Sequence, residues 1–516
     1  MFGCRRVAVV GAGVGGLVAA TLLAARGVGV VVVERSAVCG GKMRSVEIAG
    51  RQVDCGPTVF TMRRVFEDIF AAAGSSLADY LTLRPATVLA RHAWSEVERL
   101  DLFADVDRSA DAIGRFAGPQ EAKGYIEFSA RARRVYESLE APFIQSGRPS
   151  LHGLVSAFGL RGLGDLWEIS PFVSLWHTLS DHFRDPRLRQ LFGRYATYCG
   201  SSPFSAPATL MLVAHVEREG VWLVEGGMYQ LARALAALAT RAGAVLRYRS
   251  EASAIIVERG RACGVALQSG ERIDADAVIF NADTAALSCG RLGKAAAAAA
   301  PSKPIASRSL SAVTWAMVAQ TGGFPLVRHN VFFSHDYGDE FDCIRRGKLP
   351  TEPTVYVCAQ DRGDIDGCRV NEPTSAEGLF CLVNAPPIGG ANTLETPEIH
   401  QCEERTFALL RRYGLRIEHR SMNTVMTTPH DFERLYPATG GALYGPASHG
   451  WMASFRRPGS RSRIPGLYLA GGSTHPGPGV PMAAISGRLA AEAVAEDFAS
   501  MRRLLPADMS GGMLMH

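Results

Sequence analysis

The feature that most constrains this chain is a glycine-rich turn near its N-terminus, set between apolar runs. Residues Arg6 to Val10 predict a buried strand, Gly15 to Arg26 predict a helix rich in alanine and leucine, and Val28 to Glu34 predict a second strand. A strand, a helix and a strand joined this closely form a βαβ unit with parallel strands. The start of the chain therefore predicts a Rossmann-like sheet of the α/β class.

The turn itself fits the dinucleotide-binding pattern G-x-G-x-x-G with Gly11, Gly13 and Gly16, and it has a further glycine at Gly15. The first glycine permits the tight turn, the second lets the backbone approach a pyrophosphate, and the last allows close helix packing. The helix N-terminus that follows attracts phosphate groups. Glu34 ends the second strand, where a carboxylate accepts a hydrogen bond from a ribose hydroxyl. These residues predict a dinucleotide site, with NAD and FAD both open at this point.

Two segments after the second strand resemble the amine-oxidase-like FAD superfamily. Gly40, Gly41 and Lys42 come first, and Asp54-Cys55-Gly56-Pro57-Thr58 follows a short hairpin. In that superfamily the paired glycines pass close to the FAD pyrophosphate and ribityl chain, and the basic residue adds positive charge beside phosphate. The resemblance implies an FAD site that includes Arg35, Gly40, Gly41, Lys42, Gly56, Pro57 and Thr58.

The C-terminal part carries the most specific match. A predicted strand at 466–470 leads into the turn Gly471-Gly472-Ser473-Thr474-His475-Pro476-Gly477, and Gly479-Val480-Pro481 precedes a helix predicted over 482–498. This pattern resembles the bacterial carotenoid desaturases, and segments 54–62 and 191–198 most resemble the 1-hydroxycarotenoid 3,4-desaturases of purple bacteria. The resemblance implies that the last helix points its N-terminus at the flavin ring, and that FAD is also contacted by Gly471, Gly472, Gly479, Val480 and Pro481.

The resemblance covers nearly the whole chain and implies an activity. The expected reaction introduces a C3=C4 double bond into an acyclic carotenoid, 1-hydroxyneurosporene or 1-hydroxylycopene. Hydride loss next to the polyene leaves a delocalised cation, so positioning and charge stabilisation supply most of the catalysis. A phytoene desaturase, a carotenoid isomerase, an amine oxidase and a non-enzymatic lipid-escort protein are the alternatives. The electron acceptor, oxygen or a quinone, stays open.

No catalytic residue is assigned from the sequence. A proton acceptor is required, and the admissible groups are water and the side chains of His475, Asp181, His182, Glu217 and Glu225. The plainer interpretation makes His475 a turn residue with a local hydrogen bond, and makes Asp181 and His182 residues that flank a helix end.

The length of 516 residues exceeds what one core supports and predicts two domains. We expect a discontinuous FAD-binding domain made of residues 1–85, 221–290 and 446–516. We expect an inserted, mixed α+β substrate domain made of residues 86–220 and 291–445, in which 86–220 is mostly helical.

Composition excludes other classes. The formal charge of +5, from 55 basic and 50 acidic residues, is too small to indicate nucleic-acid binding. The 11 cysteines form no C-x-x-C pair, which argues against a metal site or a disulfide framework and favours the cytoplasm.

Membrane contact is expected to be peripheral, at the inner or photosynthetic membrane, because no apolar run reaches the ~20 residues that span a bilayer. The stretch 151–183 could supply a membrane-dipping face, or it could be a buried helix pair. The residues considered for this contact are Trp167, Phe172, Trp176 and Phe183, with Arg187, Arg189 and Arg194 for lipid head groups, although a solvated charged face is the plainer interpretation.

Overall fold

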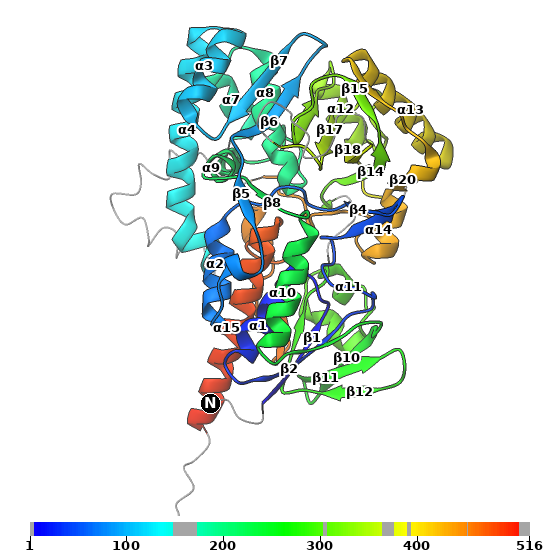
Figure 1. The fold of residues 1–516 in the computed structure, drawn as a ribbon. Helices are drawn as coiled ribbons and strands as arrows, with labels where there is room; N and C mark the ends of the chain where they lie inside the picture. The colour runs from blue at the N-terminus through cyan, green and yellow to red at the C-terminus, as the bar shows by residue number, and fades with distance from the viewer. Residues whose placement is uncertain are drawn as a thin grey trace, which may run out of the picture.

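The computed structural model describes residues 5–147, 173–302, 307–363, 376–389, 394–450 and 452–504. One end of the molecule is built on a parallel sheet that contains β1 and β2, and the other end on a larger mixed sheet with helices around it (Figure 1). The long helix α15 (Val480–Leu504) runs through the first of these bodies.

The parallel sheet has five strands in the order β21-β13-β1-β2-β9. Its strands are β21 (Leu467–Leu469), β13 (Ala277–Phe280), β1 (Arg6–Val10), β2 (Gly29–Val33) and β9 (Val245–Arg247). Strands distant in the sequence are therefore neighbours, and their carboxyl ends meet at one edge. This confirms the predicted α/β class and the predicted first strand, residue for residue.

Helices and small sheets complete this body. Helix α1 (Val14–Ala24) is buried along its whole length because α10 (Tyr229–Arg241) and α15 pack against it. The remaining elements are α2 (Arg63–Ala72), α11 (Ala285–Ser288), the three-stranded sheet β10 (Ala252–Glu258), β11 (Arg261–Leu267) and β12 (Arg272–Asp274), and the pairs β3 (Ser45–Ile48) with β4 (Arg51–Asp54) and β5 (Leu83–Pro85) with β8 (Trp222–Val224).

The mixed sheet has seven strands in the order β20-β14-β18-β17-β16-β6-β7. Its strands are β20 (Thr424–Thr427), β14 (Ser311–Ala319), β18 (Glu377–Ala385), β17 (Val355–Ala359), β16 (His329–Phe332), β6 (Val88–Ala93) and β7 (Arg99–Phe103). Helix α13 (Thr396–Arg412) packs on one face. Nearby lie α12 (Tyr337–Arg345), α14 (Pro429–Leu435) and the pair β15 (Thr321–Gly323) with β19 (Leu415–Ile417).

A helical layer covers the part of the other face formed by β16, β6 and β7, and the β3–β4 hairpin packs on the part formed by β14, β18 and β17. The helical layer comprises α3 (Val106–Ala117), α4 (Pro119–Leu139), α7 (Leu175–His182), α8 (Pro186–Gly193) and α9 (Leu212–Arg218). The expectation that residues 86–220 are mostly helical missed the hairpin β6–β7, which joins the sheet. Strand β6 is covered on both faces, so it shows no alternation of apolar and polar residues by which a sequence reveals a strand.

Within the described residues no helix is long and apolar enough to cross a membrane, and no group of His, Cys, Asp and Glu side chains is arranged to hold a metal ion.

Candidate functional site

The glycine turn is wedged against Asn281, the residue that follows β13. Gly11 has φ +102°, and a Cβ there would lie 2.7 Å from the Asn281 carbonyl oxygen. Asn281 Nδ2 donates to the carbonyl of Gly11 at 3.1 Å and would lie 2.7 Å from a Cβ on Gly16. Real Cβ atoms do not come this close, so the backbone accepts only glycine at these positions.

The first and last helices of the cofactor body cross at this turn. A Cβ on Gly15 would lie 2.9 Å from the carbonyl of Ala483 in α15 and 3.1 Å from the amide nitrogen of Gly471. The C-terminal turn is thereby held against the N-terminus of α1, while Gly479 and Val480 begin α15 beside it. Two helix N-termini, each with partial positive charge, lie close together here.

The second glycine pair joins the same place. Gly40 forms a parallel bridge with Gly13, and its amide donates to the carbonyl of Ala12 at 2.8 Å. A Cβ on Gly41 would lie 3.4 Å from the Cα of Gly13. The structure therefore brings the predicted glycines of three distant segments into one cradle.

Glu34 and Arg35 lie at the rim of this cradle. The Glu34 carboxylate accepts hydrogen bonds from the amides of Ala12 and Ser36, both at 2.8 Å. It is partly exposed and keeps lone pairs for a ribose hydroxyl. Arg35 donates to the carbonyls of Arg434 and Leu435 at the end of α14, so its guanidinium braces that helix.

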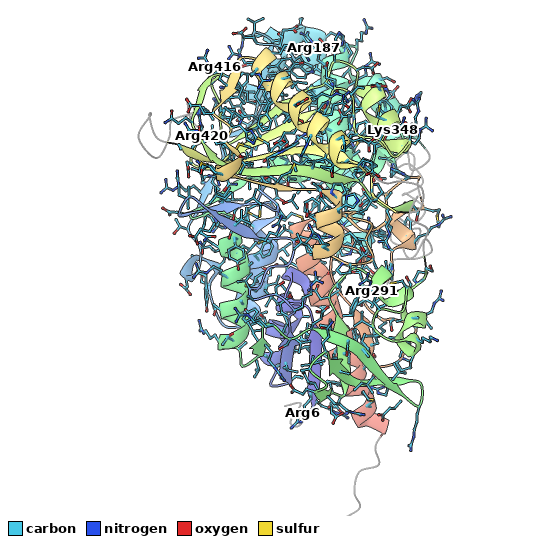
Figure 2. All side chains as sticks on the ribbon, turned by 90° about the vertical axis from the view of Figure 1, so that its right-hand side faces the viewer. Arg6, Arg187, Arg291, Lys348, Arg416 and Arg420 are labelled. Atoms are coloured by element: carbon cyan, nitrogen blue, oxygen red, sulfur yellow. The ribbon has the colours of Figure 1, made fainter. Side chains whose placement is uncertain are left out.

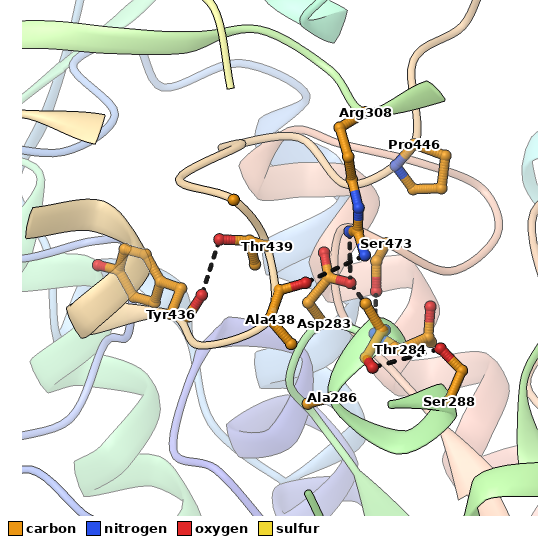
Figure 3. Close-up of polar contacts among 12 residues, drawn as sticks. Asp283, Thr284, Ala286, Ser288, Arg308, Tyr436, Ala438, Thr439, Pro446 and Ser473 are labelled. Atoms are coloured by element: carbon orange, nitrogen blue, oxygen red, sulfur yellow. Dashed lines mark hydrogen bonds and ion pairs between the residues drawn. The ribbon is translucent and has the colours of Figure 1, made fainter. Parts of the chain in front are cut away.

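Lys42 brings positive charge into the interior. Its Nζ donates to the carbonyl of Leu443 at 2.5 Å, and burial lowers the pKa of its ammonium, with Arg308 and Arg457 adding to the decrease and Asp283 opposing it. Arg308 pairs with Asp283 at 2.9 Å and also donates to the carbonyl of Ala438 (Figure 3).

Arg457 has only neutral hydrogen-bond acceptors among the described residues: the carbonyls of Tyr444, Pro446 and Gly472 and the hydroxyl of Ser448. Burial lowers the pKa of its guanidinium to about 10. Lys42, Arg308 and Arg457 thus share one carboxylate partner, Asp283, in a buried site. This excess of buried positive charge next to a glycine cradle fits a dinucleotide pyrophosphate.

The segment Gly56-Pro57-Thr58 lies against Lys42, because a Cβ on Gly56 would overlap the Lys42 carbonyl oxygen. Asp54, just before it, is buried and accepts from the amides of Met228 and Tyr229, which caps α10. Thr58 Oγ1 lies 2.6 Å from Tyr356 Oη, and this bond ties the segment to the mixed sheet.

Six partly accessible residues from both bodies of the molecule form one region: Lys42, Arg194, Tyr198, Cys199, Tyr356 and Tyr444. The Arg194 guanidinium lies over the rings of Tyr198 and Tyr356, and Lys42 donates to the carbonyl of Leu443, next to Tyr444. We call the region that these side chains share the inner chamber.

One wall of the chamber carries a hydrogen-bonded charge system. Arg194 Nη1 donates to Tyr198 Oη at 2.9 Å, and Tyr198 in turn donates to Glu217 at 3.2 Å. Tyr195 donates to the second oxygen of Glu217 at 2.5 Å. Burial raises the pKa of the Glu217 carboxyl, and its tyrosine and arginine neighbours oppose that rise. The phenol of Tyr198 therefore links a buried arginine to a buried carboxyl group.

The structure separates the candidate proton acceptors. Asp181 and Glu225 are exposed, and His182 lies at the end of α7, where it contacts Phe128. His475 is buried with Nε2 2.8 Å from the carbonyl of Phe143, and burial lowers its pKa to about 4. Glu217 is the one carboxylate among these candidates that lies beside the inner chamber.

The residues considered for membrane contact have different positions. Trp167 and Phe172 lie outside the described residues, whereas Phe183 is 1% exposed and Trp176 packs against Phe204. Of the two interpretations left open for this stretch, burial holds for Phe183, which lies in the core of the helical layer, while the partly buried Trp176 packs against the cluster of Tyr337 and Phe341.

The three arginines considered for contact with lipid head groups also lie in different places. Arg187 lies on the outside of the molecule, where it pairs with Asp185 and Glu98 (Figure 2). Arg189 donates to the carbonyl of Arg184, and Arg194 faces the inner chamber. Arg194 is therefore unable to contact lipid head groups.

A groove of about 1050 Å³ lies beside the cradle, between α10, the β3–β4 hairpin and the mixed sheet. Its walls include Arg84, Arg233, Glu47 and Glu225, and none of the predicted cofactor residues lines it. The mixture of charges of both signs makes the groove a poor host for a hydrocarbon, so the chemistry is better placed in the inner chamber.

Several residues of the site were not predicted from the sequence. Asn281 and Asp283 follow β13, and the rule that ligands bind at the carboxyl ends of parallel strands could have pointed to them. Arg308, Arg457 and Tyr356 lie far away in the chain, and only folding brings them to the cradle and the chamber.

Comparisons with known proteins agree with this geometry. Residues 14–495 match the family of flavin containing amine oxidoreductases. The hydroxyneurosporene desaturase of Rubrivivax gelatinosus is 56% identical over 99% of this chain and 97% of that protein. The hydroxyneurosporene desaturase of Cereibacter sphaeroides is 43% identical over 96% of this chain and 99% of that protein.

Solved structures support the fold. An oxidoreductase from Methanosarcina mazei superimposes with a TM-score of 0.59 at 16% identity, over 95% of this chain and 100% of that one. The match to the family and to its relatives spans almost the full length, as does the structural likeness. The chain therefore belongs to the flavin containing amine oxidoreductase family, and within it to the group formed by the hydroxyneurosporene desaturases.

Proposed function

We infer that this protein is a flavin-dependent 1-hydroxycarotenoid 3,4-desaturase. It introduces the C3=C4 double bond into acyclic 1-hydroxycarotenoids such as 1-hydroxyneurosporene. The observation that carries this function is the 56% identity with a hydroxyneurosporene desaturase over nearly the whole of both chains. The geometry supports it, since the glycine cradle and the aromatic inner chamber lie next to each other, joined by Lys42 and by the Thr58–Tyr356 hydrogen bond.

We propose FAD as the flavin. Glu34 would accept from the ribose, the glycines Gly11, Gly13, Gly40 and Gly471 would admit the pyrophosphate, and Lys42 would balance its charge. The support is the buried positive charge of Lys42 and Arg457, for which the described residues offer Asp283 alone as a carboxylate partner. When bound, FAD supplies an acceptor for the hydride that the substrate loses.

The residues of the chamber have to position the polyene and keep water out. Their aromatic rings supply apolar surface for a hydrocarbon, and the phenols keep their protons because burial raises the pKa of Tyr356 well above its usual value. Burial also lowers the pKa of His329 to about 3, so its imidazole is neutral at physiological pH. These neutral phenols and the neutral imidazole do not repel a substrate that develops positive charge, whereas the Arg194 guanidinium in the same chamber is a cation that lies close to Glu217.

Glu217 is our proposal for the proton acceptor. Its carboxyl is buried behind Tyr198, a residue of the chamber, and burial raises its pKa toward the working pH, as general-base catalysis requires. Tyr198 and Tyr195 hold it in place through hydrogen bonds to both carboxyl oxygens. The exposed Asp181 and Glu225 have no comparable position.

We propose that residues 1–85, 221–290 and 446–516 form the cofactor domain and that 86–220 and 291–445 form the substrate domain. The support is that all strands of the parallel sheet fall in the first set and all strands of the mixed sheet in the second. The substrate dissolves in membranes, so we also propose a cytoplasmic protein that binds peripherally to the inner or photosynthetic membrane and passes electrons to oxygen or a quinone.

The test is reconstitution. The purified protein is incubated with FAD and liposomes that contain 1-hydroxyneurosporene or phytoene, and the products are followed by absorption spectrum and mass. We expect a loss of two mass units and a red shift with the hydroxycarotenoid alone. Conversion of phytoene alone would instead identify a phytoene desaturase, and a spectral change without a change in mass would identify an isomerase.

A further inference from the structure

A chain of hydrogen bonds runs from the cofactor-binding segment into the mixed sheet. Thr58 Oγ1 lies 2.6 Å from Tyr356 Oη, which lies 2.7 Å from His329 Nδ1. Thr58 follows β4, Tyr356 belongs to β17 and His329 belongs to β16. Elements far apart in the sequence therefore converge on one phenol oxygen.

The sheet register directs this oxygen toward the cofactor body. In the antiparallel pair of β16 and β17, His329 is opposite Cys358 and Val331 is opposite Tyr356, so the side chains of His329 and Tyr356 are on the same face. Tyr356 packs there with residues of the β3–β4 hairpin, whereas Val355 and Val357 on the opposite face pack against α13.

Tyr356 retains one hydrogen-bonding position that no nitrogen or oxygen of the described residues occupies, beside the thiol of Cys358. A phenol oxygen offers one donor and two acceptor positions, and Thr58 and His329 occupy two of the three. The neighbouring strands pair its backbone on both sides, so the accessible surface of Tyr356 is side-chain surface in the inner chamber. The Arg194 guanidinium covers one face of the ring at 5.4 Å.

His329 fixes the phenol and has spare capacity of its own. It is 3% exposed, and its Nε2 has no hydrogen-bond partner among the described residues. A buried polar atom without a partner is rare in a folded protein and marks a place where a further polar group is expected. The unpartnered atom and the open position on Tyr356 belong to the same relay.

We propose that Tyr356, held by Thr58 and His329, hydrogen-bonds the tertiary hydroxyl of the carotenoid and so determines which bond is oxidised. This inference rests on the proposed function. Only C1 and C2 separate the hydroxyl oxygen from C3, so anchoring the oxygen on Tyr356 fixes C3 and C4 beside the segment that carries Thr58. The rest of the carotenoid is hydrocarbon, which an apolar surface holds without fixing its position along the chain.

The test measures kcat/KM for two substrates, 1-hydroxyneurosporene and the same carotenoid with hydrogen in place of the hydroxyl. Both are presented in liposomes to the FAD-loaded wild type and to Tyr356→Phe. We expect the wild type to prefer the hydroxylated substrate and Tyr356→Phe to lose that preference by roughly tenfold, as one hydrogen bond with a desolvated partner implies. Thr58→Val removes the hydrogen bond that holds the Tyr356 phenol in place, so it should reduce the preference for the hydroxylated substrate as well.

Tyr413→Phe is the matched control, because Tyr413 also has a buried phenol, which donates to the carbonyl of Phe333 at 2.9 Å on the far side of the sheet. It should keep the wild-type preference. If Tyr356→Phe lowers the rates for both substrates equally, Tyr356 has a structural role only and the inference is overturned. A wild type that binds FAD but oxidises neither substrate contradicts the proposed function instead.

Discussion

Gly15 offers a sharp test of the cradle because it lies where three segments meet. An alanine Cβ there would be 2.8 Å from Asn281 Oδ1, 2.9 Å from the carbonyl of Ala483 and 3.1 Å from the amide nitrogen of Gly471. Ordinary contact begins near 3.4 Å, so the segments must separate by roughly 0.5 Å. Overpacking of this kind costs about 1–3 kcal/mol.

Part of that cost is offset in the unliganded protein. Alanine is a better helix former than glycine by about 1 kcal/mol, and Gly15 belongs to α1. We therefore expect Gly15→Ala to change the melting temperature of the unliganded protein little. The separation occurs at the cofactor cradle, so the Kd for FAD should rise by roughly tenfold or more, the equivalent of about 1.4 kcal/mol.

The assay is titration of unliganded protein with FAD, followed by flavin fluorescence, together with thermal unfolding without FAD. Gly114→Ala is the control, because Gly114 is also helical and its Cβ would meet the Ala122 Cβ at an ordinary 3.5 Å. That variant should gain stability and keep the wild-type Kd. A Gly15→Ala protein that binds FAD as tightly as the wild type would refute the inference that FAD binds at the glycine cradle.

Further predictions concern buried polar groups. Arg308→Met should destabilise the fold by about 3–5 kcal/mol in urea denaturation, because it leaves the Asp283 carboxylate buried without its cation, and Asp283→Asn in the same chain should recover part of the loss. Asn281→Ala removes the hydrogen bond from Asn281 to the carbonyl of Gly11, which holds the glycine turn in place. The loss of one such bond, about 1 kcal/mol, should raise the Kd for FAD by roughly fivefold in the fluorescence titration. Burial lowers the pKa of His329 to about 3 and that of His475 to about 4, so between pH 7 and pH 5 these histidines take up protons in the unfolded chain only. Lowering the pH from 7 to 5 should therefore reduce the free energy of unfolding by about 2 kcal/mol per histidine. Equal urea midpoints at both pH values would contradict this.

The prediction of structure from sequence succeeded where local patterns carry the information. The βαβ unit and its glycines were recognised because a tight turn and a close helix approach tolerate no side chain. An alanine tract such as residues 295–300 carries no local signal of burial, although Ala296, Ala299 and Ala300 are buried in the cofactor body. Small apolar residues fit either environment, so composition does not distinguish them.

The sequence by itself determined the βαβ unit with its glycines and the family resemblance, because turn glycines and apolar periodicity act over a few residues. The tertiary structure alone decided which side chains share the interior. Lys42, Arg308 and Arg457 come from three distant segments, and Tyr356 meets Thr58 across 298 positions of the chain. Burial and pKa shifts arise from such long-range packing, and no local pattern encodes them.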